Sequence, residues 1–367
     1  MGNKIKINID TEKLMGQYLS NKITFFSFWL IILVVLLHSL NIQFTECSNL
    51  ICSFQYLLSH KLAQIAVPLF FFISGYLYFL KANFKKKIDL SFFINNNKKR
   101  VRTILLPYIL WSVLWFLLLY TIQLVPFLSN YFGQPLYSMS LNDKLLNLLV
   151  YPLNYPFWFL RELMLLCVLS PLLFIGIQYL KYAFIALLFV ASLFISSFLS
   201  PSDVTLLQSL PVLYFSLGAF FSLNKLSLID ASNKFTIFLL ILTWFSFNIL
   251  SVYFDKELTF NSSFLRVFNI IKDLIGCYTV WSAYDYFNQK RQWKNYSFYQ
   301  YSFFIFAFHG IPTLLFVKLS QIFKNNEYYL FGLYLIIFIS IIVMSVTIAK
   351  VAQLKMPTLY KLLIGNR

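Results

Sequence analysis

The sequence predicts an all-α protein: a polytopic transmembrane bundle of about ten helices with both termini in the cytoplasm. Three observations predict this fold. Of the 367 residues, 59% are hydrophobic and only 12% are charged, whereas soluble domains average about 25% charged residues. The apolar residues gather in segments of about 20 residues, a length that crosses a bilayer as a helix. Basic residues are frequent in every second connecting loop, which is typical of loops on alternate sides of a membrane.

Ten apolar segments are each expected to form one helix. Strands of a membrane barrel would be shorter and alternate in hydrophobicity, so helices are favoured. No small-residue cleavage site follows the first segment, so we interpret it as a helix and not as a signal peptide. The segments are 23–42, 61–80, 103–125, 157–176, 182–200, 205–222, 235–253, 263–287, 298–320 and 328–349.

The basic residues set the predicted orientation. With the N-terminus in the cytoplasm, most of the 30 lysines and arginines fall on the cytoplasmic side, where they face anionic lipid headgroups. Nucleic acid is not favoured as a partner, because these residues are spread over short loops and form no single patch. We therefore predict a cytoplasmic segment 1–22, a transmembrane domain 23–350 and a cytoplasmic tail 351–367.

Two outer loops carry further features. The longest, 126–156, contains several prolines, and a short surface helix is expected near 141–150. Loops of this length are often functional. Cys47 and Cys52 share the first outer loop, where an oxidising compartment permits a disulfide. Free thiols are the alternative, because so short a separation strains many backbones.

Two of the three histidines lie within predicted spans. His38 follows an unbroken apolar run near the outer end of the first helix. A titratable imidazole is costly to bury unpaired in a membrane, so it usually faces a cavity, a partner or a substrate. A structural histidine that bonds a neighbouring helix is the alternative. His309 is likewise either a site residue or a structural one. Gly310 and Pro312 follow it, so it alternatively marks only a kink in the helix.

Charged pairs occupy two other predicted helices. Arg161 and Glu162 begin the fourth helix at the outer face. Adjacent helical residues point about 100° apart, so each is expected to have its own partner, and both are alternatively interfacial anchors. Lys272 and Asp273 lie well inside the eighth helix. They form a neutralised pair, or Lys272 extends outward to the interface.

A basic run precedes the third helix, with Lys98, Lys99, Arg100 and Arg102. Such runs most often set topology and contact lipid headgroups. Arginine also suits phosphate, so the run is a candidate site for a phosphate-rich cytosolic ligand. The sequence contains no metal-ligand spacing, phosphate loop, dinucleotide fingerprint or G-x-S-x-G elbow.

Five segments, in this order, resemble motifs of the bacterial acyltransferase-3 family of integral membrane O-acyltransferases, and most closely its small single-domain members that act on sugars. The similar segments are 34–39 with His38, 67–76 with Ser74 and Gly75, 99–102 followed by 106–108, 157–163 followed by 170–172, and 304–310 with His309. The resemblance covers nearly the whole chain.

This chain departs from the family pattern at two positions. Many members carry an arginine eleven residues before the first-helix histidine, where this chain has Ser27. The role of that arginine is then absent or supplied from elsewhere, with Arg161 and Arg100 as candidates. The late histidine motif has Gly310 where a proline is common.

The resemblance implies an enzyme of the bacterial inner membrane, and it implies no metal. The enzyme would move an acyl group, usually acetyl, from acyl-CoA at the cytosolic face to a hydroxyl of a cell-surface glycan or lipid-linked sugar. His38 would act as general base on the acceptor hydroxyl, or as a covalent acyl carrier. Arg161 would stabilise the thioester oxyanion or hold the donor. Glu162 would orient one of these two side chains.

The resemblance also implies binding residues for both substrates. Lys99, Arg100 and Arg102 would bind the CoA phosphates, and Ser74 would line the donor path. Trp158 and His309 would lie at the acceptor. The alternative function is a transporter or flippase of lipid-linked oligosaccharide. A transporter needs polar residues along a midplane path and often broken helices in matching halves, and this sequence shows neither pattern.

Overall fold

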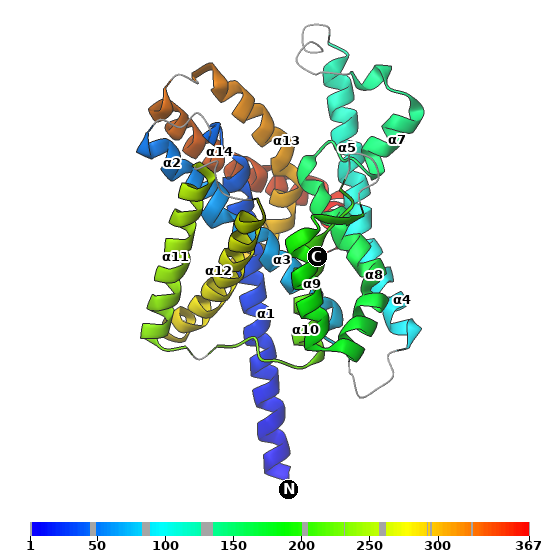
Figure 1. Ribbon diagram of the computed structural model, residues 1–367. Coiled ribbons are helices and arrows are strands. Elements are labelled where there is room, and N and C mark those ends of the chain that lie inside the picture. The colour runs from blue at the N-terminus through cyan, green and yellow to red at the C-terminus, as the bar shows by residue number, and fades with distance from the viewer. Residues whose placement is uncertain are drawn as a thin grey trace.

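The computed structural model describes residues 2–44, 49–82, 89–125, 135–199, 205–230, 232–256, 262–291, 293, 296–323 and 326–366. These residues fold into a bundle of helices, with α1 and α3 near its middle (Figure 1). The helices α11 and α12 pack against each other on one side, while α4, α5, α7 and α8 lie on the other.

The elements follow one another along the chain with short connections. In order they are α1 (Gly2–His38), α2 (Leu50–Tyr56), the π-helical turn η2 (Leu57–Leu62), the 3-10 turn η3 (Ala63–Ile65), α3 (Ala66–Phe79), α4 (Leu90–Arg100), the π-helical turn η4 (Val101–Leu105), α5 (Leu106–Gln123), η5 (Leu136–Ser138), α7 (Leu141–Leu149), η6 (Tyr155–Phe157), α8 (Trp158–Leu180), α9 (Tyr182–Phe194), β1 (Ser197–Leu199), β2 (Leu207–Gln208), α10 (Ser209–Leu223), α11 (Lys234–Lys256), α12 (Ser262–Arg291), η7 (Ser297–Tyr301), α13 (Ser302–Ser320), η8 (Gln321–Phe323), α14 (Glu327–Lys355) and α15 (Pro357–Leu363).

Seven helical segments of the described chain are long and apolar enough to cross a membrane. They are Leu14–His38, Leu50–Phe79, Leu90–Gln123, Tyr155–Leu180, Lys234–Lys256, Ser297–Phe323 and Glu327–Lys355. Each overlaps a predicted segment, and α9, α10 and α12 occupy the other three. The multi-pass helical fold is thus confirmed. The count of ten crossings and the cytoplasmic position of both termini stay predictions.

Several helices begin earlier than hydropathy indicates. The second span starts at Leu50 and the third at Leu90. Polar and basic residues at 59–61 and 95–100 interrupt the apolar pattern within these helices, so the apolar run indicates a later start. Each contains a π-helical turn, η2 in one and η4 in the other. A π turn adds a residue to a helix and is frequent at functional sites. Arg100 directly precedes η4, and Gln64 closely follows η2.

Smaller predictions can be placed on the same framework. The expected surface helix is α7, whose first turn is capped by the Ser140 side chain accepting from the backbone N–H of Asp143. Cys47 lies outside the described residues, as do residues 126–134 of the long outer loop. The strands β1 and β2 pair antiparallel, with Ser197 opposite Gln208, between α9 and α10.

The helices α3 and α10 cross in direct backbone contact. A Cβ added at Gly75 would overlap the backbone carbonyl of Phe215, and one added at Gly218 would overlap that of Phe72. Glycine at both positions is what lets two helix backbones approach this closely. Gly75 lies in the second of the similar motifs, beside Ser74, and the structure shows that it contacts α10.

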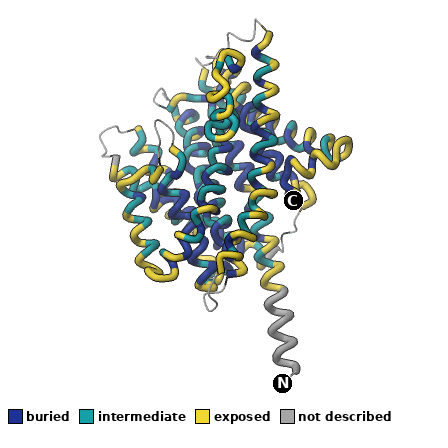
Figure 2. Tube along the Cα trace, turned by 90° about the vertical axis from the view of Figure 1, so that its right-hand side faces the viewer, coloured by how far each residue is buried: buried dark blue, intermediate teal, exposed yellow. Residues whose placement is uncertain are grey.

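The core runs through the middle of the bundle, with exposed residues on its outside (Figure 2). The outside is itself apolar: Leu117, Leu172 and Val343 each expose more than half of their surface. Such apolar exteriors are unfavourable in water and suit a lipid environment. The buried inside and the apolar outside together agree with a membrane protein.

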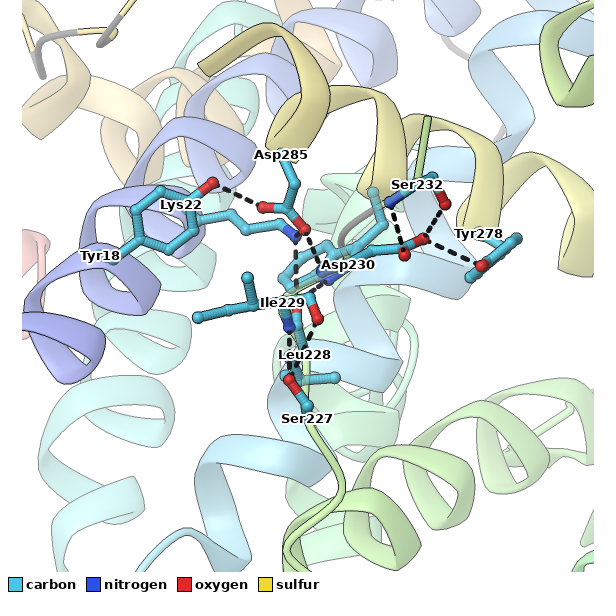
Figure 3. Close-up of polar contacts among 10 residues, drawn as sticks. Tyr18, Lys22, Ser227, Leu228, Ile229, Asp230, Ser232, Tyr278 and Asp285 are labelled. Carbon is cyan, nitrogen blue, oxygen red and sulfur yellow. Dashed lines mark hydrogen bonds and ion pairs between the residues drawn. The ribbon is translucent and has the colours of Figure 1, made fainter. Parts of the chain in front are cut away.

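A buried ion pair joins the first helix to α12. Lys22 Nζ lies 2.7 Å from Asp285 Oδ2, and both side chains are fully buried. Lys22 also donates to the carbonyl of Leu228, while Asp285 accepts from the Tyr18 hydroxyl and from the backbone N–H of Asp230 (Figure 3). The chain between α10 and α11 is thereby held against both helices.

Candidate active site

A cavity of about 680 Å³ lies between the helices. Most of its wall is apolar, and α1, α3, α8, α10, α12 and α13 all contribute to it. Its wall includes Ser27, His38, Arg100, Trp158, Gln208 and Ser302. Arg100 lies against Tyr78, near the C-terminal end of α3. Ser27 and His38 are eleven residues apart on α1, which corresponds to about 16 Å of helix. The cavity therefore extends over much of the bilayer thickness.

His38 is half-buried at the cavity wall. Its ring lies 5.5 Å from the ring of His309 in a stacked arrangement, and 4.7 Å from the ring of Tyr155, which meets it edge-on. These three aromatic side chains come from α1, α13 and η6. The structure thus brings together the two histidines that the sequence singled out, and it adds Tyr155.

His309 lies behind His38, fully buried and outside the cavity wall. Its Nδ1 is 2.7 Å from the carbonyl of Phe306 and 3.2 Å from that of Ile305. Because a carbonyl only accepts, Nδ1 carries a proton, and the hydrogen-bond pattern assigns this tautomer. Nε2 has no hydrogen-bond partner among the described residues. It is therefore a bare acceptor in the neutral ring.

Gly310 explains how Tyr155 reaches His38. A Cβ at Gly310 would overlap Asn154 Oδ1 and the ring of Pro156, the two residues that flank Tyr155. The Asn154 amide also donates to the carbonyl of Ala307, at 2.9 Å. Glycine at this position thus lets the loop pack directly on α13.

Arg161 and Glu162 point in different directions, as adjacent helical residues were expected to. The Arg161 guanidinium donates to the carbonyls of Val150 and Thr205, at 2.6 and 2.7 Å, and does not line the cavity. Glu162 is fully buried, and its carboxylate oxygens have no hydrogen-bond partner among the described residues. Neither side chain is brought into contact with His38 by any described interaction.

The residues of the basic run also differ in whether they line the cavity. Arg100 is half-buried, lines the cavity and lies 6.0 Å from the centre of the Tyr78 ring. Lys99 and Arg102 are exposed and do not line it. Ser74, by contrast, lines the cavity. Of the two candidates for the role of the missing first-helix arginine, Arg100 is the one that shares a cavity with Ser27.

Lys272 and Asp273 form the neutralised pair, since Lys272 is fully buried and its Nζ lies 3.4 Å from Asp273 Oδ1. Asp273 also lines the cavity, together with Gln64 and Tyr214. Sequence reasoning did not assign these three residues to a site. Gln64 is a polar residue in an apolar stretch and was a usable signal, whereas Tyr214 is one of 24 tyrosines.

The fold and the cavity define a multi-pass helical membrane protein with an internal site that has a histidine in one part and an arginine in another. A family model described as an acyltransferase domain matches residues 23–350. The chain belongs to this family, acyltransferase family 3, and is an acyltransferase. The resemblance and the enzyme class predicted from the motifs are confirmed, and the transporter alternative is not retained.

One curated relative is similar over part of its length. The succinoglycan biosynthesis protein ExoH of Rhizobium meliloti (strain 1021) is 33% identical over 139 residues. This match covers 36% of the present chain and 35% of that protein. No solved structure matches the chain significantly. Within the described residues, no three His, Cys, Asp or Glu side chains are grouped as metal ligands.

Proposed function

We propose that this protein transfers an acyl group, most simply acetyl, from acyl-CoA to a hydroxyl of a polysaccharide or lipid-linked sugar. The observation that carries the proposal is one cavity that contacts both Arg100 and His38. A donor held by phosphate at the arginine and an acceptor beside the histidine would meet inside it. The name of the relative, a succinoglycan biosynthesis protein, supports a polysaccharide as the acceptor class.

The donor is proposed to bind at the Arg100 part of the cavity. Guanidinium groups form strong, charge-assisted hydrogen bonds to phosphate. The exposed Lys99 and Arg102 add positive charge beside Arg100. The long pantetheine arm of CoA then extends along the apolar wall, past Ser74, and carries the thioester toward His38. The mostly apolar wall disfavours water, which protects the thioester from hydrolysis.

His38 is proposed to act as general base. Its imidazole takes the proton of the acceptor hydroxyl as the oxygen attacks the thioester carbonyl. When the tetrahedral intermediate collapses, the carbon–sulfur bond breaks, and His38 returns the proton to the departing thiolate. The products are the acyl ester and free CoA. His309, stacked on His38 at 5.5 Å, is proposed to hold the imidazole in place.

Three further predicted residues receive roles, and those of Arg161 and Glu162 are modified. Trp158, three residues after Tyr155, lines the cavity and offers an aromatic face to a sugar ring. Arg161 is engaged by the carbonyls of Val150 and Thr205, so we propose that it anchors the outer loops over the site. Glu162 would then act through its neighbour Gln208, which lines the cavity.

The proposal is tested by acyl transfer with protein in lipid nanodiscs, radiolabelled acetyl-CoA, and the deacylated polysaccharide fraction of the producing cells. His38→Ala should lower the rate by about 100-fold or more, the usual scale of general-base catalysis. His60→Gln is the matched control, because His60 stacks on Tyr56 and does not line the cavity. A normal rate in His38→Ala would reject the catalytic assignment.

A second form of the mechanism passes the acyl group through His38 as a covalent intermediate. Acid-quenched samples distinguish the two forms. Label that stays on the unaltered protein without acceptor, and is absent from His38→Ala, indicates the relay. Label found only on the polysaccharide supports direct transfer.

A further inference from the structure

Three polar side chains line the cavity without a role in the chemistry above. Gln64 comes from η3, Tyr214 from α10 and Asp273 from α12. Tyr214 is 3% exposed and Asp273 is 7% exposed, so both are almost completely enclosed by protein while still bordering the cavity. We call these three residues the Asp273 subsite.

The Asp273 subsite has unused hydrogen-bonding capacity. Tyr214 Oη has no hydrogen-bond partner among the described residues, and Asp273 Oδ1 has none there beyond its 3.4 Å ion-pair contact with Lys272 Nζ. Buried polar groups are nearly always hydrogen-bonded, because losing water without a replacement is unfavourable. An unpartnered phenol and a carboxylate with one long contact on the same cavity wall therefore point to a polar ligand that completes them.

The charges behind the subsite favour a ligand that donates hydrogen bonds. Lys272 Nζ is 3.2 Å from Gln64 Oε1 and 3.4 Å from Asp273 Oδ1. This buried lysine provides a counter-charge, so that Asp273 faces the cavity as a carboxylate. A carboxylate only accepts hydrogen bonds. The complementary ligand surface therefore carries several donors.

The subsite lies between the His38 and Ser27 ends of the cavity. The Ser59 hydroxyl donates to the carbonyl of Leu36, which places η2 beside the end of α1 that carries His38. The second span then runs antiparallel to α1, so Gln64, five residues after Ser59, lies about 7–8 Å farther toward Ser27. The Lys272 contact then fixes Asp273 at the depth of Gln64.

We propose that the Asp273 subsite binds hydroxyl groups of the acceptor sugar and thereby selects the acceptor. The inference rests on the proposed function and names its acceptor-binding residues. A sugar presents adjacent hydroxyl donors together with apolar ring faces, and the subsite offers a carboxylate, a phenol and an amide in a cavity that Trp158 also lines. The pantetheine arm has few donors and suits a carboxylate less well.

The test measures separate KM values for acceptor and donor in nanodisc-embedded protein, with acetyl-CoA and the deacylated polysaccharide titrated by mass. Tyr214→Phe removes only one oxygen, and Asp273→Asn removes the charge. Each should raise the acceptor KM about tenfold, as expected for a lost ligand hydrogen bond. The KM for acetyl-CoA should stay unchanged.

Matched controls come from elsewhere in the bundle. Tyr334→Phe alters a buried tyrosine outside the cavity wall, whose hydroxyl accepts a hydrogen bond from the Ser59 hydroxyl at 2.8 Å. Asp255→Asn alters an aspartate paired with Lys61, at 2.6 Å. Neither Tyr334 nor Asp255 lines the cavity, so both controls should keep the acceptor KM of the unaltered protein. Thermal unfolding tests whether each variant is folded. If Asp273→Asn does not fold, the KM values of Tyr214→Phe decide the proposal.

The outcomes are distinguishable. A raised KM for acetyl-CoA with an unchanged acceptor KM would assign the subsite to the pantetheine arm and overturn the proposal. Unchanged KM values for both substrates in Tyr214→Phe would overturn it as well. If the unaltered protein consumes no acetyl-CoA, the proposed function fails first, and the subsite assignment fails with it.

Discussion

His38 and His309 have different surroundings although their rings stack 5.5 Å apart. His38 borders the cavity, whereas His309 is fully buried and fixed through Nδ1 to the backbone of its own helix. One imidazole is therefore positioned to meet substrate, and the other to support it. This division follows from the hydrogen bonds of α13 and not from the sequence motif.

The histidine pair yields a prediction at the residue scale. His309→Phe keeps a ring of similar size against His38 but removes Nε2, the acceptor that has no partner among the described residues. We expect kcat to fall by about tenfold or more while the KM for acyl-CoA stays constant, because donor binding lies elsewhere in the cavity. His309→Asn, which retains a polar group, should recover part of kcat. An unchanged kcat in His309→Phe would show that the two rings do not act together.

Arg100 yields a second prediction. Arg100→Gln should raise the KM for acyl-CoA by about tenfold or more, since hydrogen bonds to charged groups contribute about 1.5–3 kcal/mol. Arg102→Gln is the control and should have a smaller effect, because Arg102 is exposed and does not line the cavity. Ser27→Arg, combined with Arg100→Gln, should restore part of donor binding. Equal effects of the two Arg→Gln changes would contradict a specific role for Arg100.

At the scale of elements, the crossing of α3 and α10 depends on two glycines. Gly75→Ala should destabilise the protein by about 1–3 kcal/mol, because the new methyl group overlaps the carbonyl of Phe215 and over-packing costs about this much. Gly332→Ala is the control, since nothing lies within 4 Å of a Cβ at that helical position. It should be neutral or slightly stabilising. Thermal unfolding in detergent measures both, and equal stabilities would contradict the close crossing.

The elements also show what sequence patterns can and cannot predict. Hydropathy located every long helix, because apolar runs of this length have few other uses. It missed the first parts of the second and third spans, because polar and basic residues at 59–61 and 95–100 interrupt the apolar pattern there. Ser74, Arg100, Trp158 and His38 were predicted as site residues, and they line one cavity.

The direction of Arg161 could not be predicted in the same way. It depends on where the outer loops place the carbonyls of Val150 and Thr205. Tyr155 was missed for a similar reason, because it reaches His38 only through the packing of its loop on Gly310. Contacts between distant segments have no local signature in one sequence.

At the scale of the whole molecule, the Lys22–Asp285 pair joins α1 to α12, two helices far apart in the sequence. Lys22→Met leaves Asp285 buried without its counter-charge and should cost about 3–5 kcal/mol. The double variant Lys22→Met with Asp285→Leu removes both charges and should be less destabilised than Lys22→Met alone. Resistance to unfolding in denaturing detergent provides the measurement. A double variant that is less stable than Lys22→Met would show that the two charges are not energetically coupled.

The close crossing of α3 and α10 at Gly75 and Gly218 also limits how substrates can move through this protein. Two helices whose backbones touch cannot rock apart without losing their closest contact, so the wall that contains Ser74 behaves as a fixed frame. A fixed wall beside a cavity of about 680 Å³ is unsuited to moving a whole saccharide chain from one face of the membrane to the other. It suits a reaction in which the pantetheine arm brings a small acyl group to a sugar hydroxyl in the cavity. The rest of the CoA and the rest of the polysaccharide then stay outside the cavity, each on its own side of the membrane.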